Sequence, residues 1–252
     1  MDKQPVFFCV CSQKGGVGKS TFTILLANWL HYALGRDVLV VDCDAPQWSI
    51  VAQRERELDV LERNDRYKLM MVRLFKRTGR KIWPVVRSTP YEGLQAARAY
   101  FAAGDREADF VLLDLPGTVA APGIFRLLAR LDHLFIPLKA DKLVLESALS
   151  FARAVDERLV HNDAHRLKGL HLFWTMVDRR ERTPLYESYG KAFAAFRLPV
   201  LQTQVPYRSR FSKEILDTSG AVGRSTLFPA DRAFAADAAL DALAAEILSL
   251  ME

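Results

Sequence analysis

The chain has 252 residues, of which half are hydrophobic, and a formal net charge of +5 at pH 7. This composition excludes a disordered chain, and the length fits one α/β domain over residues 1–252. No apolar run approaches the roughly 20 residues of a membrane-spanning helix. The first residues lack a secretion signal, so we expect a cytoplasmic protein.

Strand-like and helix-like segments alternate along the chain. Short apolar runs predict strands at 6–11, 38–42, 82–86, 110–114, 133–138, 170–177 and 200–205, and Pro84 marks the third as an edge or a bulge. Helices are predicted at 20–33, 49–76, 91–103, 124–131, 144–160, 184–196 and about 230–250. The alternation predicts a single doubly wound, mostly parallel sheet with helices on both faces.

The residues between the first strand and the first helix form a glycine-rich loop. They read Lys14-Gly15-Gly16-Val17-Gly18-Lys19-Ser20-Thr21. Because glycines permit positive φ angles, the backbone N–H groups of this loop can line a nest for phosphate oxygens. Lys19 is placed to reach the β- and γ-phosphates, Ser20 to bind Mg²⁺ and Thr21 to reach the α-phosphate. A strand, such a loop and a helix in that order predict a nucleotide phosphate-binding loop.

Carboxylates follow two of the predicted strands. Asp114 ends the fourth strand, where it is expected to hold the Mg²⁺ shell, and Gly117 in the next loop is placed to donate its N–H to the γ-phosphate. Asp42 and Asp44 follow the second strand, and Asp44 is a second candidate for the metal shell. A strand-end cap or a turn is the alternative role for this pair.

The loop departs from the general phosphate-loop pattern, since Gln13 stands where a glycine is expected and Lys14 precedes the glycines. This deviant Walker A form resembles the ParA/MinD family of ATPases, and the overall likeness is closest to short ParA-type partition proteins of plasmids and conjugative elements. The resemblance implies a P-loop fold of the SIMIBI type, ATP and Mg²⁺ as cofactors, and slow hydrolysis of ATP. It also implies that Lys14 crosses a dimer interface to the partner's γ-phosphate and that Asp44 orients the attacking water. The catalytic set is then Lys14, Lys19 and Asp44, with Ala45 inserted into the family's Asp-x-Asp-Pro-Gln switch.

The adenine contacts are also inferred from the resemblance. Thr175 stands where the family usually has an asparagine near the base, and Val205-Pro206-Tyr207 resembles the family's loop against adenine. We therefore expect Thr175 and Pro206 to contact the nucleotide.

Basic residues gather in two regions of the sequence. All charged residues from 68 to 87 are basic, and their partner is left open. A later set carries the expected DNA contacts, which are Arg179, Arg180, Arg208, Arg210, Lys213 and Arg224. Charge and resemblance together predict an ATP-dependent homodimer that binds double-stranded DNA without sequence preference, a ParB-like activator and no membrane contact. Solvated helix faces with salt bridges are the alternative explanation for the charge.

Two other functions on the same scaffold remain open. A MinD-like positioning ATPase needs a basic amphipathic C-terminal helix, whereas residues 230–252 carry one basic and five acidic residues. The second alternative is a metabolic relative, either an iron–sulfur electron donor or a small-molecule ligase. The three cysteines, Cys9, Cys11 and Cys43, form no CxxC pair and are expected to be free buried thiols.

Overall fold

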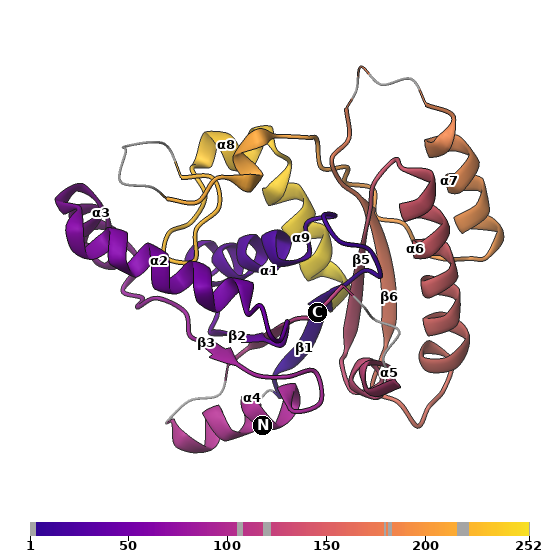
Figure 1. Ribbon diagram of the computed structural model, residues 1–252, viewed down its shortest axis with the longest axis horizontal. Helices are drawn as coiled ribbons and strands as arrows, with labels where there is room; N and C mark the ends of the chain where they lie inside the picture. The colour runs from indigo at the N-terminus through magenta and orange to yellow at the C-terminus, as the bar shows by residue number, and fades with distance from the viewer. Residues whose placement is uncertain are drawn as a thin grey trace.

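The computed structural model describes residues 4–104, 108–117, 122–178, 180, 183–215 and 222–251. Its centre is a six-stranded sheet in the order β3-β2-β4-β1-β5-β6, and every neighbouring pair is parallel (Figure 1). The predicted α/β class and parallel sheet are therefore confirmed.

The strands are β1 (Val6–Val10), β2 (Val38–Asp42), β3 (Val85–Arg87), β4 (Phe110–Asp114), β5 (His133–Leu138) and β6 (Gly169–Trp174). The α-helices are α1 (Lys19–Asn28), α2 (Ser49–Arg63), α3 (Asp65–Thr78), α4 (Gly93–Ala103), α5 (Pro122–Leu128), α6 (Lys142–Val155), α7 (Leu185–Ala195), α8 (Arg232–Asp237) and α9 (Leu240–Met251). Two π-helical turns, η1 (Trp29–Ala33) and η2 (Asp156–Val160), extend α1 and α6, and a 3₁₀ turn, η3 (Ser209–Ser212), precedes α8.

Each face of the sheet is covered by its own set of helices. In β1, Phe7 and Cys9 pack with α4, α5, α6 and α7, whereas Phe8 and Val10 pack with α1, α8 and α9. β2, β4 and β5 are buried along their whole length because side chains alternate between two covered faces. This is why these strands read as continuous apolar runs, and why 38–42, 110–114 and 133–138 were predicted with their observed bounds.

The carboxyl ends of three central strands lie level with one another. Val10 of β1 and Asp42 of β2 both pair with Asp114 of β4. Because all strands run the same way, the loops that follow them meet at one edge of the sheet. The glycine loop and both carboxylate segments therefore share this edge.

Two predicted helices are each divided in two. Residues 49–76 form α2 and α3 because Asn64 is extended, and its side chain accepts hydrogen bonds from the N–H groups of Arg66 and Tyr67 and so caps α3. The last helix is divided into α8 and α9, because Ala239 has a φ of 54°. That turn lets Phe234 of α8 and Leu243 of α9 pack on the same face of the sheet.

The predicted strand at 200–205 is wrong, and that at 82–86 is shifted. Residues near 200 and 206 make only isolated bridges to the β6 side of the sheet. Between them, the N–H groups of Gln202 and Thr203 donate to the carboxylate of Glu246 in α9, which interrupts the ladder. β3 begins at Val85, after Pro84, and lies at the edge of the sheet as predicted.

Candidate functional site

The glycine loop takes the backbone form that phosphate binding requires. Gly16 and Gly18 have φ angles of 73° and 96°, which are strained for any residue with a side chain. At Gly18 an added Cβ would also lie 3.0 Å from the Phe22 ring. α1 begins directly at Lys19, so its free N–H groups and the positive end of its dipole face the loop.

The two lysines of the loop lie in different surroundings. The Lys19 ammonium donates to the carbonyl oxygen of Lys14 over 3.5 Å. Gly117, from the loop after β4, comes so close that a Cβ there would lie 3.4 Å from Lys19 Nζ. Lys14 is exposed, and among the described residues no acceptor contacts its ammonium group. The Lys19 ammonium is thus in contact with its own chain, whereas the exposed Lys14 ammonium has no such contact within the described residues.

Asp114 and Ser20 form the candidate metal site. Ser20 Oγ donates to Asp114 Oδ2 over 2.7 Å, although 94 positions separate the two residues. Asp114 Oδ1 is buried and has no hydrogen-bond partner among the residues that the structure describes. Burial raises the pKa of Asp114 to about 7, aided by the nearby carboxylates of Asp42 and Asp44, and the Ser20 hydroxyl opposes the shift. A buried carboxylate oxygen without a donor, beside a hydroxyl, fits Mg²⁺, which binds through oxygen ligands and neutralises such a group.

The two aspartates at the carboxyl end of β2 have different roles in the structure. Asp42 is fully buried, and its carboxylate accepts from the N–H groups of Ile50, Val51 and Asp44. It therefore caps the start of α2, as the alternative for this pair anticipated. Asp44 is half-buried; burial raises its pKa, and the Lys19 charge lowers it. Asp44 thus lies close enough to Lys19 to feel its charge, beside the glycine loop.

The two candidates for adenine binding lie on adjacent segments. Thr175 directly follows β6 and is buried. Val177 pairs with Pro206 in an isolated bridge, and Tyr207 donates its N–H to the Val177 carbonyl oxygen. The structure thus brings the Thr175 and Pro206 segments together. Among the described residues, the Thr175 side chain makes no hydrogen bond.

The candidate DNA contacts that the structure describes differ in how they are paired with acidic residues. Arg179 lies outside the described residues. Arg180 pairs with Asp178, and Arg208 with Asp237. Arg210 and Lys213 are exposed, and neither makes an ion pair in the described ranges.

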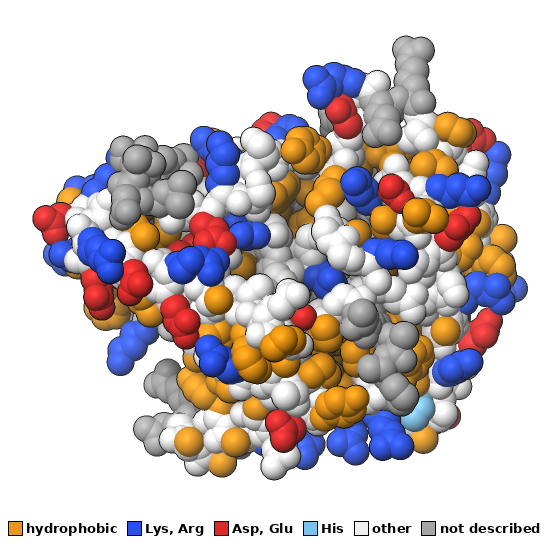
Figure 2. All heavy atoms as spheres, viewed as in Figure 1, with side chains coloured by type: hydrophobic (Ala, Val, Ile, Leu, Met, Phe, Trp, Pro, Cys, Tyr) orange, Lys and Arg blue, Asp and Glu red, His pale blue; other side chains and the backbone are white. Residues whose placement is uncertain are grey.

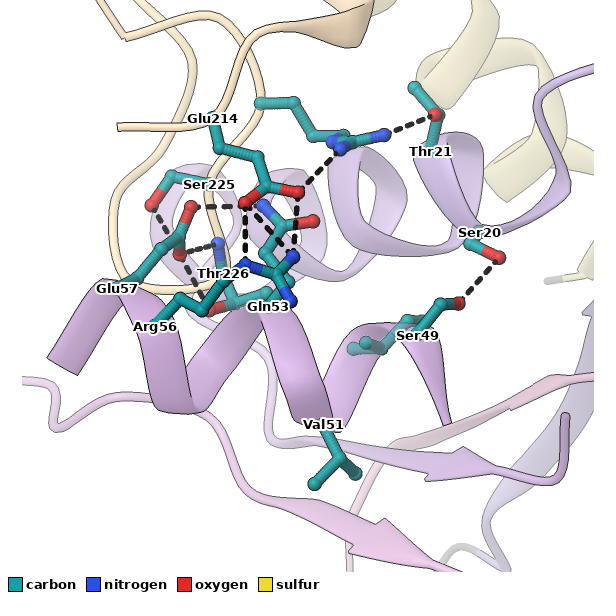
Figure 3. A network of polar contacts seen from close by, with 12 residues as sticks. Ser20, Thr21, Ser49, Val51, Gln53, Arg56, Glu57, Glu214, Ser225 and Thr226 are labelled. Carbon is teal, nitrogen blue, oxygen red and sulfur yellow. Dashed lines mark hydrogen bonds and ion pairs between the residues drawn. The ribbon is translucent and has the colours of Figure 1, made fainter. Parts of the chain in front are cut away.

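Arg224, the last of these candidates, lies beside the phosphate loop. Its side chain is 19% exposed, and its guanidinium donates to Thr21 Oγ1 over 3.1 Å and to Glu214 over 3.0 Å. Glu214 also holds Arg56 of α2 (Figure 3). The sequence contains no signal for this chain of contacts, because Arg224 and Thr21 are 203 positions apart.

A second cluster ties α2 to the same segment. Glu57 is 1% exposed, and its carboxylate accepts from Gln53, from the Ser225 hydroxyl and from both the N–H and the hydroxyl of Thr226 (Figure 3). Each donor satisfies part of a buried charge, which would be costly if left unpaired. This cluster therefore holds the segment that carries Arg224 to the phosphate loop.

The Glu57 cluster leads to a stability prediction. Glu57→Ala leaves buried donors of Ser225 and Thr226 unpaired, so we expect it to lower the free energy of unfolding by roughly 3 kcal/mol. Urea unfolding measures the change. Glu62→Ala, at an exposed position of the same helix, is the control and should cost less than about 0.5 kcal/mol. Equal effects of the two substitutions would contradict the prediction.

Comparison with known proteins identifies the family. The model of the CobQ/CobB/MinD/ParA nucleotide binding domain matches residues 8–221. The chain belongs to this family. The match covers the glycine loop, both carboxylate segments and the Thr175 and Pro206 segments, so the site described above lies within the CobQ/CobB/MinD/ParA domain.

Individual relatives are more distant. The chromosome-partitioning ATPase Soj of Thermus thermophilus is 27% identical over 220 residues, which cover 73% of this chain and 86% of Soj. An iron–sulfur cluster carrier protein of Bacillus subtilis is 34% identical over 124 residues, but the match spans 46% of this chain and 34% of the carrier. A plasmid partition protein from Borrelia burgdorferi has a TM-score of 0.54 at 20% identity, covering 82% of this chain and 91% of that one. These likenesses support the family and the fold without assigning a particular role.

Other features bear on the alternatives. All three cysteines of the sequence are buried and free, as predicted. Within the described ranges, no cluster of three or more histidine, cysteine or acidic side chains is arranged to hold a metal ion. No helix in the same ranges combines the length and apolar character needed to cross a bilayer.

Proposed function

We propose that this protein is a ParA-type ATPase that partitions DNA, converting ATP and water to ADP and phosphate in a nucleotide-sandwich dimer. The observation that carries the proposal is the contrast between the two loop lysines. Lys19 contacts Gly117 and the loop, whereas the Lys14 ammonium is exposed and has no acceptor in the part of the chain that the structure describes. An unpaired cation at the rim of a phosphate nest is suited to a phosphate held by a second subunit.

Within one subunit, the residues bind the nucleotide and neutralise its charge. The N–H groups at the start of α1 and the Lys19 ammonium hold the phosphate oxygens. Ser20 and Asp114 would hold Mg²⁺, which supplies further positive charge beside the phosphates when bound. Asp44, half-buried and near Lys19, accepts a hydrogen bond from the attacking water and so orients it.

The dimer completes the site. Phosphoryl transfer depends mainly on positioning and on offsetting charge at the γ-phosphate. One subunit provides Lys19, and the partner provides its own Lys14. Hydrolysis is therefore slow in the monomer and remains slow until a ParB-like activator completes the geometry.

In this proposal, DNA is bound by the exposed cations among the six candidate contacts and not by all six. Arg210 and Lys213 extend from the segment that follows Pro206, and both are exposed. Arg180 and Arg208 are engaged by acids of their own chain, and Arg224 by Glu214 and Thr21. We therefore assign the main contacts with duplex phosphates to Arg210 and Lys213. Each subunit of the dimer contributes one copy of this pair.

Salt dependence tests this assignment. Arg210→Ala/Lys213→Ala is expected to weaken ATP-dependent binding to duplex DNA about tenfold. Because each lost phosphate contact removes about 0.9 from the slope of log K against log salt, the slope should also become shallower by about 2 per chain. Fluorescence anisotropy at several salt concentrations measures both quantities.

The control for the DNA experiment carries the same change in charge at other exposed positions. Arg63→Ala/Arg158→Ala removes two exposed arginines, in α2 and η2, and should leave the slope unchanged. Wild-type protein whose affinity for DNA is independent of salt, with or without ATP, would contradict DNA partition while leaving ATP hydrolysis untouched.

The two alternatives receive less support. An iron–sulfur carrier needs accessible thiolates, and all three cysteines are buried. A MinD-like role needs a basic amphipathic helix, and α9, which contains Asp241 and Glu246 and no basic residue, does not supply one. ATP-dependent co-sedimentation with anionic liposomes would favour the MinD-like role.

A further inference from the structure

A second basic region lies at the opposite edge of the sheet from the glycine loop. A hollow of about 700 Å³ opens there, beside the start of β1 and between α4, α5 and the loop before β6. Five of its lining residues are cationic or can become so, namely Arg98, Arg126, Arg130, His165 and Arg166. Figure 2 shows several blue side chains and one histidine along the lower edge of the molecule, below the position of α5 in Figure 1.

The charges of this hollow are mostly uncompensated. Among its described lining residues there is no carboxylate. Arg98, Arg126 and Arg130 are exposed, and in the described part of the chain none of them makes an ion pair or a side-chain hydrogen bond. Like charges gathered around one concave surface raise its potential and favour a bound anion. Arginine is also the side chain best suited to bidentate contacts with phosphate oxygens.

Arg166 differs from the others because it is held in place. Its guanidinium pairs with the buried Asp132, donates to the Pro5 carbonyl oxygen over 2.9 Å, and lies 5.2 Å from the centre of the Phe7 ring. Asp132 in turn accepts from the N–H of Phe7. Arg166 is therefore fixed by contacts with its own chain. The three arginines without a partner among the described residues line the same hollow, from α4, from α5 and from the turn after α5.

The lining between the cations is apolar. Phe7, Leu94 and Phe101 contribute to it, and Phe7 is 8% exposed. A volume of about 700 Å³ lies within the usual range of small-molecule sites, about 300–1,000 Å³. Apolar walls with several converging cations suit a ligand that has both an apolar body and an anionic group. Duplex DNA would contact the rim of such a hollow and leave the apolar walls uncovered.

We propose that this hollow binds an organic phosphate, that is, a phosphomonoester or diphosphate carried on a planar or apolar body. The phosphate is bound by Arg98, Arg126 and Arg130, and the body packs against Phe7, Leu94 and Phe101. The site is separate from the glycine loop, and the proposal is independent of the function proposed above.

The test uses the full chain carrying Lys19→Ala, so that the phosphate loop does not contribute. Calorimetric titration with 1-naphthyl phosphate should show binding at least about tenfold tighter than that of inorganic phosphate or of 1-naphthol. Adding Arg126→Gln/Arg130→Gln should weaken the binding at least about tenfold, because two charged contacts are lost. Adding Arg63→Gln/Lys76→Gln, which removes the same charge from exposed positions of α2 and α3, should leave it unchanged.

Several results would overturn the proposal. They are the absence of binding, inorganic phosphate binding as tightly as the naphthyl ester, and equal losses in the two double variants. If Arg126→Gln/Arg130→Gln placed in the wild-type chain abolishes ATP-dependent binding to duplex DNA, and the Lys19→Ala parent binds no naphthyl phosphate, the hollow is instead a nucleic-acid surface. If circular dichroism shows that the double variant is unfolded, Arg98→Gln on α4 replaces it in the test. This single variant should bind naphthyl phosphate at least about threefold more weakly than the parent.

Discussion

Asp44→Ala is expected to trap the protein as an ATP-bound dimer. The carboxylate lies within reach of the Lys19 charge, and in the described part of the chain it caps no helix, so its removal should leave nucleotide binding intact while the attacking water loses its orientation. Groups that orient or deprotonate a reacting water typically contribute 10²-fold or more, so we expect hydrolysis to fall about 100-fold. Size-exclusion chromatography with ATP and Mg²⁺ should show a persistent dimer that retains duplex DNA.

The comparison for this experiment is Lys19→Ala. That substitution removes the ammonium group enclosed by the loop and Gly117, so the variant should bind ATP poorly, stay monomeric and leave DNA unbound. An Asp44→Ala variant that hydrolyses ATP at the wild-type rate would eliminate the assigned role of Asp44. A monomeric Asp44→Ala variant with bound ATP would eliminate the sandwich dimer.

Lys14→Ala is expected to separate nucleotide binding from dimer formation. Because the Lys14 ammonium has no acceptor within the described part of its own chain, its loss should change ATP affinity of the monomer little. The partner's γ-phosphate would lose a charged contact made in the transition state. Removal of one such group commonly costs about 100-fold, so hydrolysis should fall by about that factor, and the ATP-dependent dimer should disappear.

A lysine at the same edge of the sheet provides the control. Lys139 follows β5 directly and is exposed, so Lys139→Ala removes the same charge near the loops without touching the glycine loop. Light scattering with ATP measures the mass of each variant, and fluorescent nucleotide titration measures binding. If Lys14→Ala dimerises and hydrolyses ATP like Lys139→Ala, the trans role of Lys14 is wrong.

The backbone form of the glycine loop was predictable from sequence because it is local. Its N–H groups, glycines and lysine belong to consecutive residues, and the following helix supplies the rest. The central strands were readable for a similar reason, since burial on both faces leaves an uninterrupted apolar run. The edge of the sheet was harder: β3 has three residues, and the segment at 200–205 lost its strand pairing to Glu246.

Side-chain partners far apart in the sequence were decided by the tertiary structure. Asp42 and Asp44 look equivalent in the sequence. In the structure, however, the Asp42 carboxylate caps α2, whereas Asp44 lies within reach of the Lys19 charge. Arg224 was grouped with surface cations, but its guanidinium lies against Thr21. Nothing local distinguishes these cases, because each depends on which acceptor packing brings within hydrogen-bond distance.

By itself, then, the sequence determined the strand–loop–helix unit, the parallel class of the sheet and the position of the glycine loop between β1 and α1. These follow from φ/ψ preferences and burial patterns over a few residues. Only the tertiary structure decided that Ser20 meets Asp114 with one carboxylate oxygen unpaired, and that uncompensated arginines from α4 and the end of α5 surround one hollow. Those arrangements arise when segments many positions apart are packed together, and hydrogen bonds and charges respond to distance in space rather than to separation along the chain.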